Sequence, residues 1–545
     1  MFKKLHAHLT NKKRRIASLM NEGFTLDRDT IVVLDFGGQY THLISRRVRE
    51  LGVYSEILSY DTPLAELEKV PGVRGIIFSG GPSSVYDEDS PRVSREFFSW
   101  CREKRLPVLG ICYGHQLIIH VLGGGVKRLD RREYGKTVLY VENKEDLFKG
   151  LGDREIVWMS HGDQVVELPE GFEKIGHTDN CPIAAYRNTE SGIYGVQFHI
   201  EVRHTERGME ILENFVRGIC GCSPTWRMED WIEETVRGIR ERVGDGRVIM
   251  AVSGGVDSTV AAVLLHRAVG KNLHCVFVDN GLLRKNEAEE VIRRFKQHGF
   301  EHFHFVDAGE TFLSRLKGVT DPEEKRRIIA DTFIRIFETK ARELEKTYGK
   351  IEYLGQGTIY PDRVESAATS KASAKIKSHH NVTLPEGMTL KLVEPLASLY
   401  KDEVRKVGKM LGLGDDVVWR QPFPGPSLAV RIIGEVTREK LRILREADAI
   451  VQEEIQKSDF RKRLWQSFAV LLPVKTVGVM GDARTYENVI AIRAVESEDA
   501  MTANFAKLDW DLLERIASRI VNEVEGVNRV VYDITNKPPS TVEWE

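Results

Sequence analysis

Cys112 is the residue whose surroundings in this sequence most clearly suggest covalent chemistry. It stands in Gly110-Ile111-Cys112-Tyr113-Gly114, after an apolar run and before the helical stretch HQLIIHVL. Glycines two residues before and after it permit the sharp strand-to-helix turn that exposes a nucleophile. A helix N-terminus favours a thiolate, and the first amides of the helix can hold an oxyanion. Taken alone, this pattern fits a buried structural cysteine equally well.

Partners for this thiol are found later in the chain. The segment FHIE (198–201) closes a predicted strand, and residues two apart on a strand point to the same face. Glu201 could therefore orient His199. The imidazole would then take the proton of Cys112 and later protonate the leaving amine.

A glycine turn, FSGGPSS (78–84), follows another predicted strand and could complete an oxyanion hole with its amides. Together with Cys112 and FHIE it resembles the class I glutamine amidotransferases, whose glutaminase domain carries Cys, His and Glu in this order. The resemblance implies that Cys112 is the nucleophile, His199 the base and Glu201 its orienter. The groups implied to contact the substrate glutamine and its oxyanion are Gly80, Gly81, Tyr113 and Gln116.

A second glycine-rich loop, SGGVDST (253–259), lies between a predicted strand and a helix, where backbone amides and the helix dipole favour a bound anion. It lacks the lysine of a Walker A loop. It resembles instead the pyrophosphate loop of the ATP pyrophosphatase families, which cleave ATP between its α and β phosphates and adenylate an acceptor oxygen. Asp257 would help to hold Mg²⁺. The implied ATP-binding residues are Ser253, Gly254, Gly255, Val256, Asp257, Ser258 and Thr259.

The two motifs in one chain imply a coupled reaction. A glutaminase makes ammonia, and an adenylating site turns a carbonyl oxygen into a good leaving group. Their fusion predicts the amidation or amination of an acyl or enol-like carbonyl, with ammonia passed internally.

The acceptor is indicated by longer motifs spread over 354–545, among them LGQGTIYPDRVES, RQPFPGPSLAVRI and DITNKPPSTVEWE. With the earlier motifs they resemble the glutamine-hydrolysing GMP synthase family, from about Thr30 to the last residue. The family reaction converts XMP, ATP, glutamine and water into GMP, AMP, pyrophosphate and glutamate. The resemblance implies XMP contacts at Arg326, Asp482, Lys537 and Glu543. Lys325 and Arg327 are expected to add local positive charge.

Three positions depart from the family pattern. Ile200 replaces the proline of a usual His-Pro-Glu, so a fixed φ is lost beside the catalytic pair. Thr383 lies where the mobile lid usually has two glycines after Asn-Val, and Ser427 replaces a common glycine. We expect these changes to affect geometry and rate, and not the class of reaction.

The elements that must position these residues follow an alternating pattern. From Thr30, short apolar runs alternate with helical stretches, a rhythm typical of a parallel sheet covered by helices. The series restarts after the small-residue segment 218–226, and the pattern changes again at QPFPGPS. The predicted fold class is α/β, with two doubly wound parallel-sheet catalytic domains followed by a smaller α+β dimerisation domain.

The predicted boundaries follow from these changes. Residues 1–29 are expected to form a basic, flexible tail, although a transit peptide or a nuclear signal is also conceivable. The glutaminase domain is predicted at 30–223 and the ATP pyrophosphatase domain at 224–420. The C-terminal dimerisation and XMP-binding domain is predicted at 421–545. The family resemblance implies a homodimer.

Length and composition limit the number of domains, the kinds of partner and the redox setting. The 545 residues correspond to three or four domains at about 150 residues each. Since the formal net charge is −2, there is no global basic field for nucleic acid, and we expect neither nucleic-acid nor membrane partners. Six cysteines are too few for a disulfide scaffold in a chain of this length, so a reducing, cytoplasmic setting is expected.

Rival assignments fit less well. A glutamine-dependent asparagine synthetase would need an N-terminal cysteine, whereas this chain begins Met-Phe. Glutamine-dependent NAD synthetases use a nitrilase-like Glu-Lys-Cys set, and CTP synthase places a Walker-like loop before its glutaminase. A catalytically silent binding module would most easily arise by loss of Cys112 or of the 253–259 loop, and both are present.

Overall fold

The computed structural model describes residues 28–364, 390–480, 482–497 and 502–545. The chain divides into two compact units, of which the first runs to Glu234 and the second begins at Thr235. Most of the expected basic tail (1–27) and the expected lid position Thr383 lie outside the described residues.

The first unit is built on a nine-stranded sheet in the order β2-β1-β3-β4-β9-β8-β7-β5-β6. Its first five strands are parallel, as the alternating apolar runs predict. Strands β1, β4 and β9 are almost fully buried, because helices cover both faces of a sheet of this kind. The parallel strands are β1 (Thr30–Asp35), β2 (Tyr54–Ser59), β3 (Val73–Phe78), β4 (Val108–Ile111) and β9 (Ile193–Val196).

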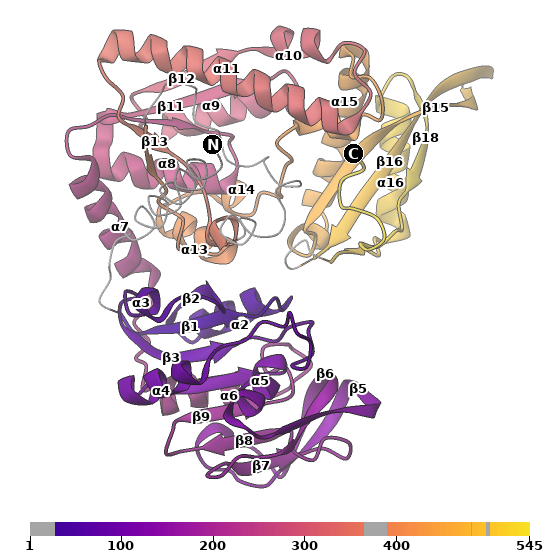
Figure 1. The fold of residues 1–545 in the computed structure, drawn as a ribbon. Helices are drawn as coiled ribbons and strands as arrows, with labels where there is room; N and C mark the ends of the chain where they lie inside the picture. The colour runs from indigo at the N-terminus through magenta and orange to yellow at the C-terminus, as the bar shows by residue number, and fades with distance from the viewer. Residues whose placement is uncertain (1–27, 365–389, 481, 498–501) are drawn as a thin grey trace, which may run out of the picture. The chain divides into compact units, whose positions relative to one another are not determined.

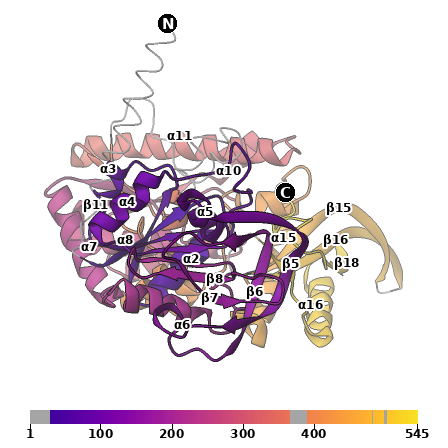
Figure 2. The ribbon, with the colours of Figure 1, turned by 60° about the horizontal axis from the view of Figure 1, so that its bottom comes forward.

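The other half of this sheet is antiparallel, which accounts for the β-rich sequence between Lys136 and Val196. Its longest strands, β5 and β6, pair side by side and antiparallel (Figure 2). The antiparallel strands are β5 (Gly125–Val141), β6 (Arg154–Glu167), β7 (Glu173–His177) and β8 (Ala185–Asn188). The helices of this unit include α2 (Thr41–Glu50), α3 (Leu64–Leu67), α4 (Arg95–Lys104), α5 (Tyr113–Leu122) and α6 (Gly208–Glu213).

The second unit contains a five-stranded parallel sheet in the order β12-β11-β10-β13-β14. The strand order reverses at β10, and ligands of such sheets bind beyond the carboxyl ends of the strands at that point. The strands are β10 (Val248–Ala251), β11 (Leu273–Asp279), β12 (Phe303–Asp307), β13 (Tyr353–Gly355) and β14 (Lys391–Val393). The helices are α7 (Met228–Val243), which spans the division between the units, α8 (Val256–Val269), α9 (Glu287–Gln297), α10 (Gly309–Leu316), α11 (Pro322–Tyr348), α13 (Lys401–Met410) and α14 (Asp415–Val418).

The C-terminal part is α+β, as predicted. Strands β15 (Gln466–Met480) and β16 (Ala483–Glu496) form a long antiparallel pair, β17 (Asn504–Phe505) is antiparallel to β16, and β18 (Val527–Tyr532) is parallel to β16. Helices α15 (Arg438–Gln456) and α16 (Trp510–Glu523) complete it (Figure 1).

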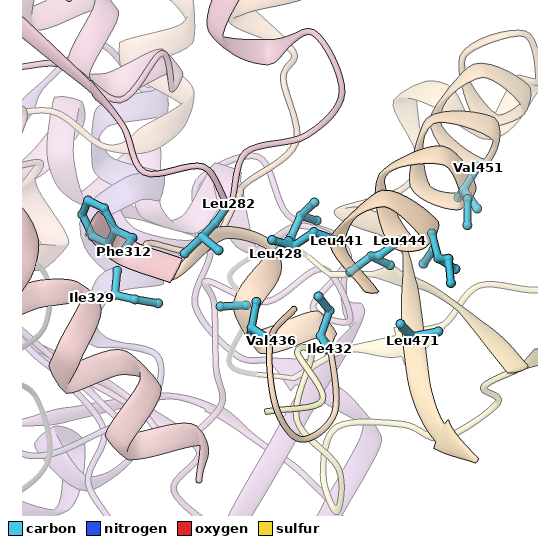
Figure 3. Close-up of a cluster of buried hydrophobic side chains, with 14 of the residues drawn as sticks. Leu282, Phe312, Ile329, Leu428, Ile432, Val436, Leu441, Leu444, Val451 and Leu471 are labelled. Carbon is cyan, nitrogen blue, oxygen red and sulfur yellow. The ribbon is translucent and has the colours of Figure 1, made fainter. Parts of the chain in front are cut away.

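One hydrophobic core joins the parallel sheet of the second unit to this C-terminal part. Figure 3 shows the side chains that meet there, among them Leu282, Phe312, Ile329, Leu428, Ile432 and Leu471. The core therefore continues across the expected boundary near residue 420, and the three-domain division stays a prediction. No described helix has the length and apolar character needed to cross a membrane.

Candidate active sites

Cys112 lies in the turn between a buried strand and a helix. Strand β4 ends at Ile111 and α5 begins at Tyr113, which leaves Cys112 between them with φ 55° and ψ −107°. A positive φ at a residue other than glycine costs about 1–3 kcal/mol and is common at functional sites. The Cys112 N–H donates to the Val196 carbonyl at 2.9 Å, so the neighbouring strand β9 holds this strained turn in place.

The second part of the site is a buried His–Glu pair. His199 Nδ1 and Glu201 Oε1 are 2.7 Å apart. The Cys112 thiol donates to the Ser160 carbonyl at 3.7 Å and acts on the imidazole through its charge. Burial lowers the pKa of His199, but the charges of Glu201 and Cys112 outweigh burial and hold that pKa well above its usual value. The prediction that residues 198–201 close a strand is wrong. Since β9 ends at Val196, both residues lie in the bend that follows it.

The bend that carries this pair is held without the family's proline. The Thr205 hydroxyl donates to the His199 carbonyl, and Arg47 Nε donates to the Glu201 carbonyl at 3.0 Å. Ile200 itself is buried at 1% exposure. Hydrogen bonds and packing thus supply much of the constraint that a fixed proline φ would otherwise give.

Gly80 borders the reacting pair. A Cβ added at Gly80 would lie 3.4 Å from His199 Cε1 and 3.7 Å from Cys112 Cβ, which places the backbone of this turn against both side chains. At Gly81 an added Cβ would come within 2.8 Å of the Phe36 carbonyl oxygen, so only glycine fits. The turn therefore lies against the reacting pair, and the role of its amides in holding an oxyanion stays a prediction.

Tyr113 and Gln116 follow the thiol on α5, and both are buried. The Tyr113 hydroxyl donates to the Pro91 carbonyl at 2.6 Å. The hydroxyl is therefore engaged by the protein, and the backbone amide of Tyr113, next to Cys112 in the chain, is the group that we expect to face an oxyanion. Gln116 Nε2 donates to the carbonyl of Asp163 and to Oε1 of Gln197. The amide nitrogen of Gln116 is thus already held by the protein, and its contact with a substrate stays a prediction.

One neighbour of the pair was not singled out from the sequence. The ring of Tyr40 meets the His199 ring edge-on, with centroids 5.2 Å apart. Tyr40 precedes α2, and its only sequence signal is its place after the first predicted strand, where a parallel sheet presents ligand-binding groups.

The loop after β10 is held by hydrogen bonds between its own side-chain hydroxyls and its backbone. Helix α8 begins at Val256, inside the 253–259 motif and not after it as the sequence predicts. The hydroxyls of Ser258 and Thr259 donate to the Gly255 carbonyl at 3.1 and 2.8 Å. Gly254 has φ 73°, and a Cβ there would lie 2.4 Å from Val291 Cγ2, so the loop needs glycine at that point. The N-terminus of α8 and this loop have the arrangement that suits an anion, and their binding of phosphate stays a prediction.

Cations reach this loop from distant parts of the chain. Lys401, at the start of α13, is paired with Asp257 Oδ2, and Arg420 donates to the Gly254 carbonyl at 3.0 Å. Neither residue was predicted from the sequence, although Arg420 begins RQPFPGPSLAVRI, one of the motifs that carry the family resemblance. The other oxygen of Asp257, Oδ1, is buried without a hydrogen-bond partner, which suits a carboxylate that ligates a cation.

Arg326 lies on α11 close to the end of the chain, where it donates to the Glu545 backbone carbonyl. Its neighbour Lys325 does not add free positive charge. The Lys325 ammonium is buried, pairs with the Glu545 carboxylate and donates to the Ile432 carbonyl at 2.7 Å. Burial lowers the pKa of Lys325, with Glu545 acting in the opposite direction. Arg327 is exposed and pairs with Glu324 on the same helix.

Glu543 is engaged by the protein as well. Both its oxygens accept from the buried Arg431 guanidinium, at 3.0 and 2.9 Å. Lys537 exchanges backbone hydrogen bonds with Ala503 at 2.7 and 3.0 Å. Asp482 lies exposed at the turn between β15 and β16. The structure thus brings Arg326 near the C-terminal segment that carries Lys537 and Glu543, and it places Asp482 at the end of a hairpin.

Ser427, which replaces a glycine common in the family, adopts a left-handed backbone conformation. It has φ 57° and is 3% exposed. Asn280 Nδ2 donates to its hydroxyl at 3.2 Å, and this bond offsets part of the cost of a left-handed serine.

Comparisons with known proteins cover both units. Residues 32–219 match the family described as glutamine amidotransferase class-I, so this part of the first unit has the fold of that family. Residues 453–544 match the GMP synthase C terminal domain, and 243–307 match the thiamine biosynthesis protein (ThiI) family.

Whole-chain relatives define the family more narrowly. A GMP synthase [glutamine-hydrolyzing] of Carboxydothermus hydrogenoformans is 56% identical over 517 residues, which cover 94% of this chain and 99% of that protein. The one of Aquifex aeolicus is 56% identical over 521 residues, covering 95% and 100%. Among solved structures, a glutamine amidotransferase of Thermotoga maritima has 20% identity, covers 39% of this chain and 97% of its own, and has a TM-score of 0.27. The chain belongs to the glutamine-hydrolysing GMP synthase family.

Proposed function

We propose that this chain converts XMP into GMP, with glutamine as the nitrogen donor and ATP as the activating substrate. The observation that carries the proposal is the presence in one chain of a buried Cys112–His199–Glu201 set and a phosphate loop at 253–259. Relatives that match over almost their full length and are named GMP synthase [glutamine-hydrolyzing] support it.

The first half-reaction uses the side chains of the amidotransferase unit. His199 takes the thiol proton, and the Cys112 sulfur attacks the carboxamide carbon of glutamine. Amides of the Gly80–Gly81 turn and of Tyr113 hold the oxyanion. The His199 imidazolium, kept protonated by Glu201, gives its proton to the departing ammonia, and water then hydrolyses the glutamyl thioester.

The second half-reaction uses the loop of the second unit. The 253–259 amides and the α8 N-terminus hold the β and γ phosphates of ATP, while Lys401, paired with Asp257, and Arg420, paired with Glu287, position the loop. An XMP oxygen attacks the α phosphate, pyrophosphate leaves, and ammonia displaces AMP from the adenylated carbon. Asp257 would hold Mg²⁺ through its unpartnered oxygen, and the ion would neutralise phosphate charge.

Binding of XMP is assigned to Arg326, Lys537, Glu543 and Asp482, on the family pattern. A homodimer is part of the proposal. Exposed apolar side chains on the β15–β16 hairpin support it, because covering them with a partner lowers the free energy of the assembly. Val479 is 75% exposed and Tyr486 is 64% exposed. Six unpaired cysteines support a reducing, cytoplasmic location.

The test is to separate the two nitrogen sources. We expect Cys112→Ala to abolish glutamine-dependent GMP formation and to leave the reaction with ammonium salt largely intact, because thiol chemistry belongs to the first half-reaction alone. Cys101→Ala is the matched control, since Cys101 is buried in α4 of the same unit and should leave both activities unchanged. Glutaminase activity retained by Cys112→Ala would refute the assignment, and a lack of GMP from XMP with either source would refute the acceptor.

A further inference from the structure

Three histidines that the mechanism does not use lie on one face of the second unit's parallel sheet. His274 is in β11, His304 is in β12, and His302 immediately precedes β12. The two strands are parallel neighbours, with Cys275 paired to Phe303 and the Cys275 N–H donating to the His302 carbonyl at 2.9 Å. Because alternate residues of a strand share a face, this register brings all three imidazoles together.

The geometry of the cluster suits a metal ion. One ring nitrogen of each histidine lies within 4.8 Å of the others, and His274 Nδ1 is 3.2 Å from His304 Nε2. Zinc–nitrogen bonds of 2.0–2.1 Å in a tetrahedron separate two ligand nitrogens by about 3.3 Å. The spacing of this pair already matches the edge of such a tetrahedron.

Two of the three imidazoles, those of His274 and His304, lie where burial disfavours the charged form. Burial lowers the pKa of His274 to about 4, with smaller effects from the neighbouring histidines and Arg247. Burial and Lys340 lower the pKa of His304 to about 4. The Lys340 ammonium is itself paired with Glu343 at 3.0 Å, which reduces its repulsion of a bound cation.

The cluster is separate from the nucleotide loop. His274 is the second residue of β11, so it lies at the amino ends of the parallel strands, whereas the 253–259 loop follows the carboxyl end of β10. Tyr348, at the end of α11, closes the cluster, with its ring 4.7 Å from that of His274 and 4.9 Å from that of His302. A ligand here would connect β11 and β12 beside the end of α11 and would not touch the reacting groups.

We propose that His274, His302 and His304 bind one divalent transition-metal ion of the zinc type, with water as the fourth ligand, and that this ion stabilises the fold. Imidazole is a preferred ligand of such ions, and three histidines with one open position form a known ligand set. The rings of His302 and His304 are almost parallel, at 2°, so both turn about χ2 to direct their lone pairs at one ion. The shared hydrogen bond between His274 and His304 is replaced by the metal, and the ring that donated it takes its other tautomer.

The experiment uses the full-length chain with Cys112→Ala as background, which removes the catalytic thiol as a competing zinc ligand. Zn²⁺ is titrated after treatment with a chelator, and the bound metal is counted after dialysis. We expect one Zn²⁺ per chain at this site, and at least a tenfold weaker affinity with His302→Gln or His304→Gln. His298→Gln, at the end of α9, is the control, because His298 is half-buried like those two but lies outside the cluster.

Two further measurements exclude a merely structural role for the histidines. Zn²⁺ at a hundredfold excess over its dissociation constant should raise the unfolding midpoint by roughly 5 °C in the background protein and not in His302→Gln. Co²⁺ in place of Zn²⁺ should show the visible absorption of a nitrogen-ligated tetrahedral ion. The proposal is overturned if His302→Gln and His304→Gln bind zinc as tightly as His298→Gln does. It is also overturned if the cobalt spectrum shows thiolate ligation.

Discussion

Replacing Glu543 with alanine should release the C-terminal segment that we assign to the XMP pocket. The Glu543 carboxylate makes two hydrogen bonds with the Arg431 guanidinium, whose side chain is 0% exposed. Removal of one partner from a buried ion pair costs about 3–5 kcal/mol, because the other charge stays buried. Arg431 keeps its ion pair with the buried Asp448 carboxylate at 4.0 Å and its contact with the Phe468 ring, 3.9 Å from the ring centroid, so we expect a cost at the lower end of this range.

A loss of about 3 kcal/mol corresponds to a change in the local opening equilibrium on the order of a hundredfold. Amide hydrogen exchange of the peptide that covers residues 536–545 measures this opening directly. The same variant should raise the KM for XMP at least tenfold in the ammonium-dependent assay. The glutaminase rate without XMP should stay the same, since its residues belong to the other compact unit.

A comparison with two further variants separates anchoring from direct contact. Lys537→Ala should raise the KM for XMP without faster exchange in 536–545, because its backbone pairing with Ala503 remains. In a double-mutant cycle with Arg431→Met, the effects of Glu543→Ala and Arg431→Met on exchange should be strongly non-additive. Additive effects, or unchanged exchange in Glu543→Ala, would refute the anchoring argument.

The remaining predictions concern the two reaction centres and the departure at residue 427. Asp257→Asn should lower AMP release at least a hundredfold with glutamine or with ammonium salt, since it removes the carboxylate charge and an oxygen suited to a cation; unchanged ATP turnover would move the nucleotide site elsewhere. Glu201→Gln removes the negative charge that raises the pKa of His199, so that pKa falls and the imidazolium needed to protonate ammonia is lost at lower pH. The alkaline limb of the glutaminase pH profile should therefore move to lower pH, and a profile that does not move would contradict the pairing. Ser427→Ala should destabilise the chain by about 1 kcal/mol through loss of the bond from Asn280, whereas Ser427→Gly should be more stable than the alanine variant because glycine relieves the positive φ. Thermal unfolding midpoints rank the two, and the reverse order would show that strain at this residue is unimportant.

Features that depend on neighbours in the chain were predictable. The turn around Cys112 follows from its flanking glycines, and the parallel half of the first sheet follows from the alternating apolar runs. Boundaries that depend on tertiary contacts were less predictable. Helix α8 starts inside the 253–259 motif, since its first turn forms part of the loop, and β9 stops before His199 because the chain bends to bring Glu201 against it.

The order of the elements and the chemistry of each motif follow from residue types and their spacing, because spacing along the chain controls local conformation and shared faces. The tertiary structure establishes which distant charges meet. Lys401 pairs with Asp257 across 144 positions, and Arg431 pairs with Glu543 across 112. It also decided that three histidines share one face, since that depends on the register of β11 against β12. Contacts of this kind form only when packed strands and helices exclude water and bring remote segments into contact, and residue spacing along the chain does not encode them.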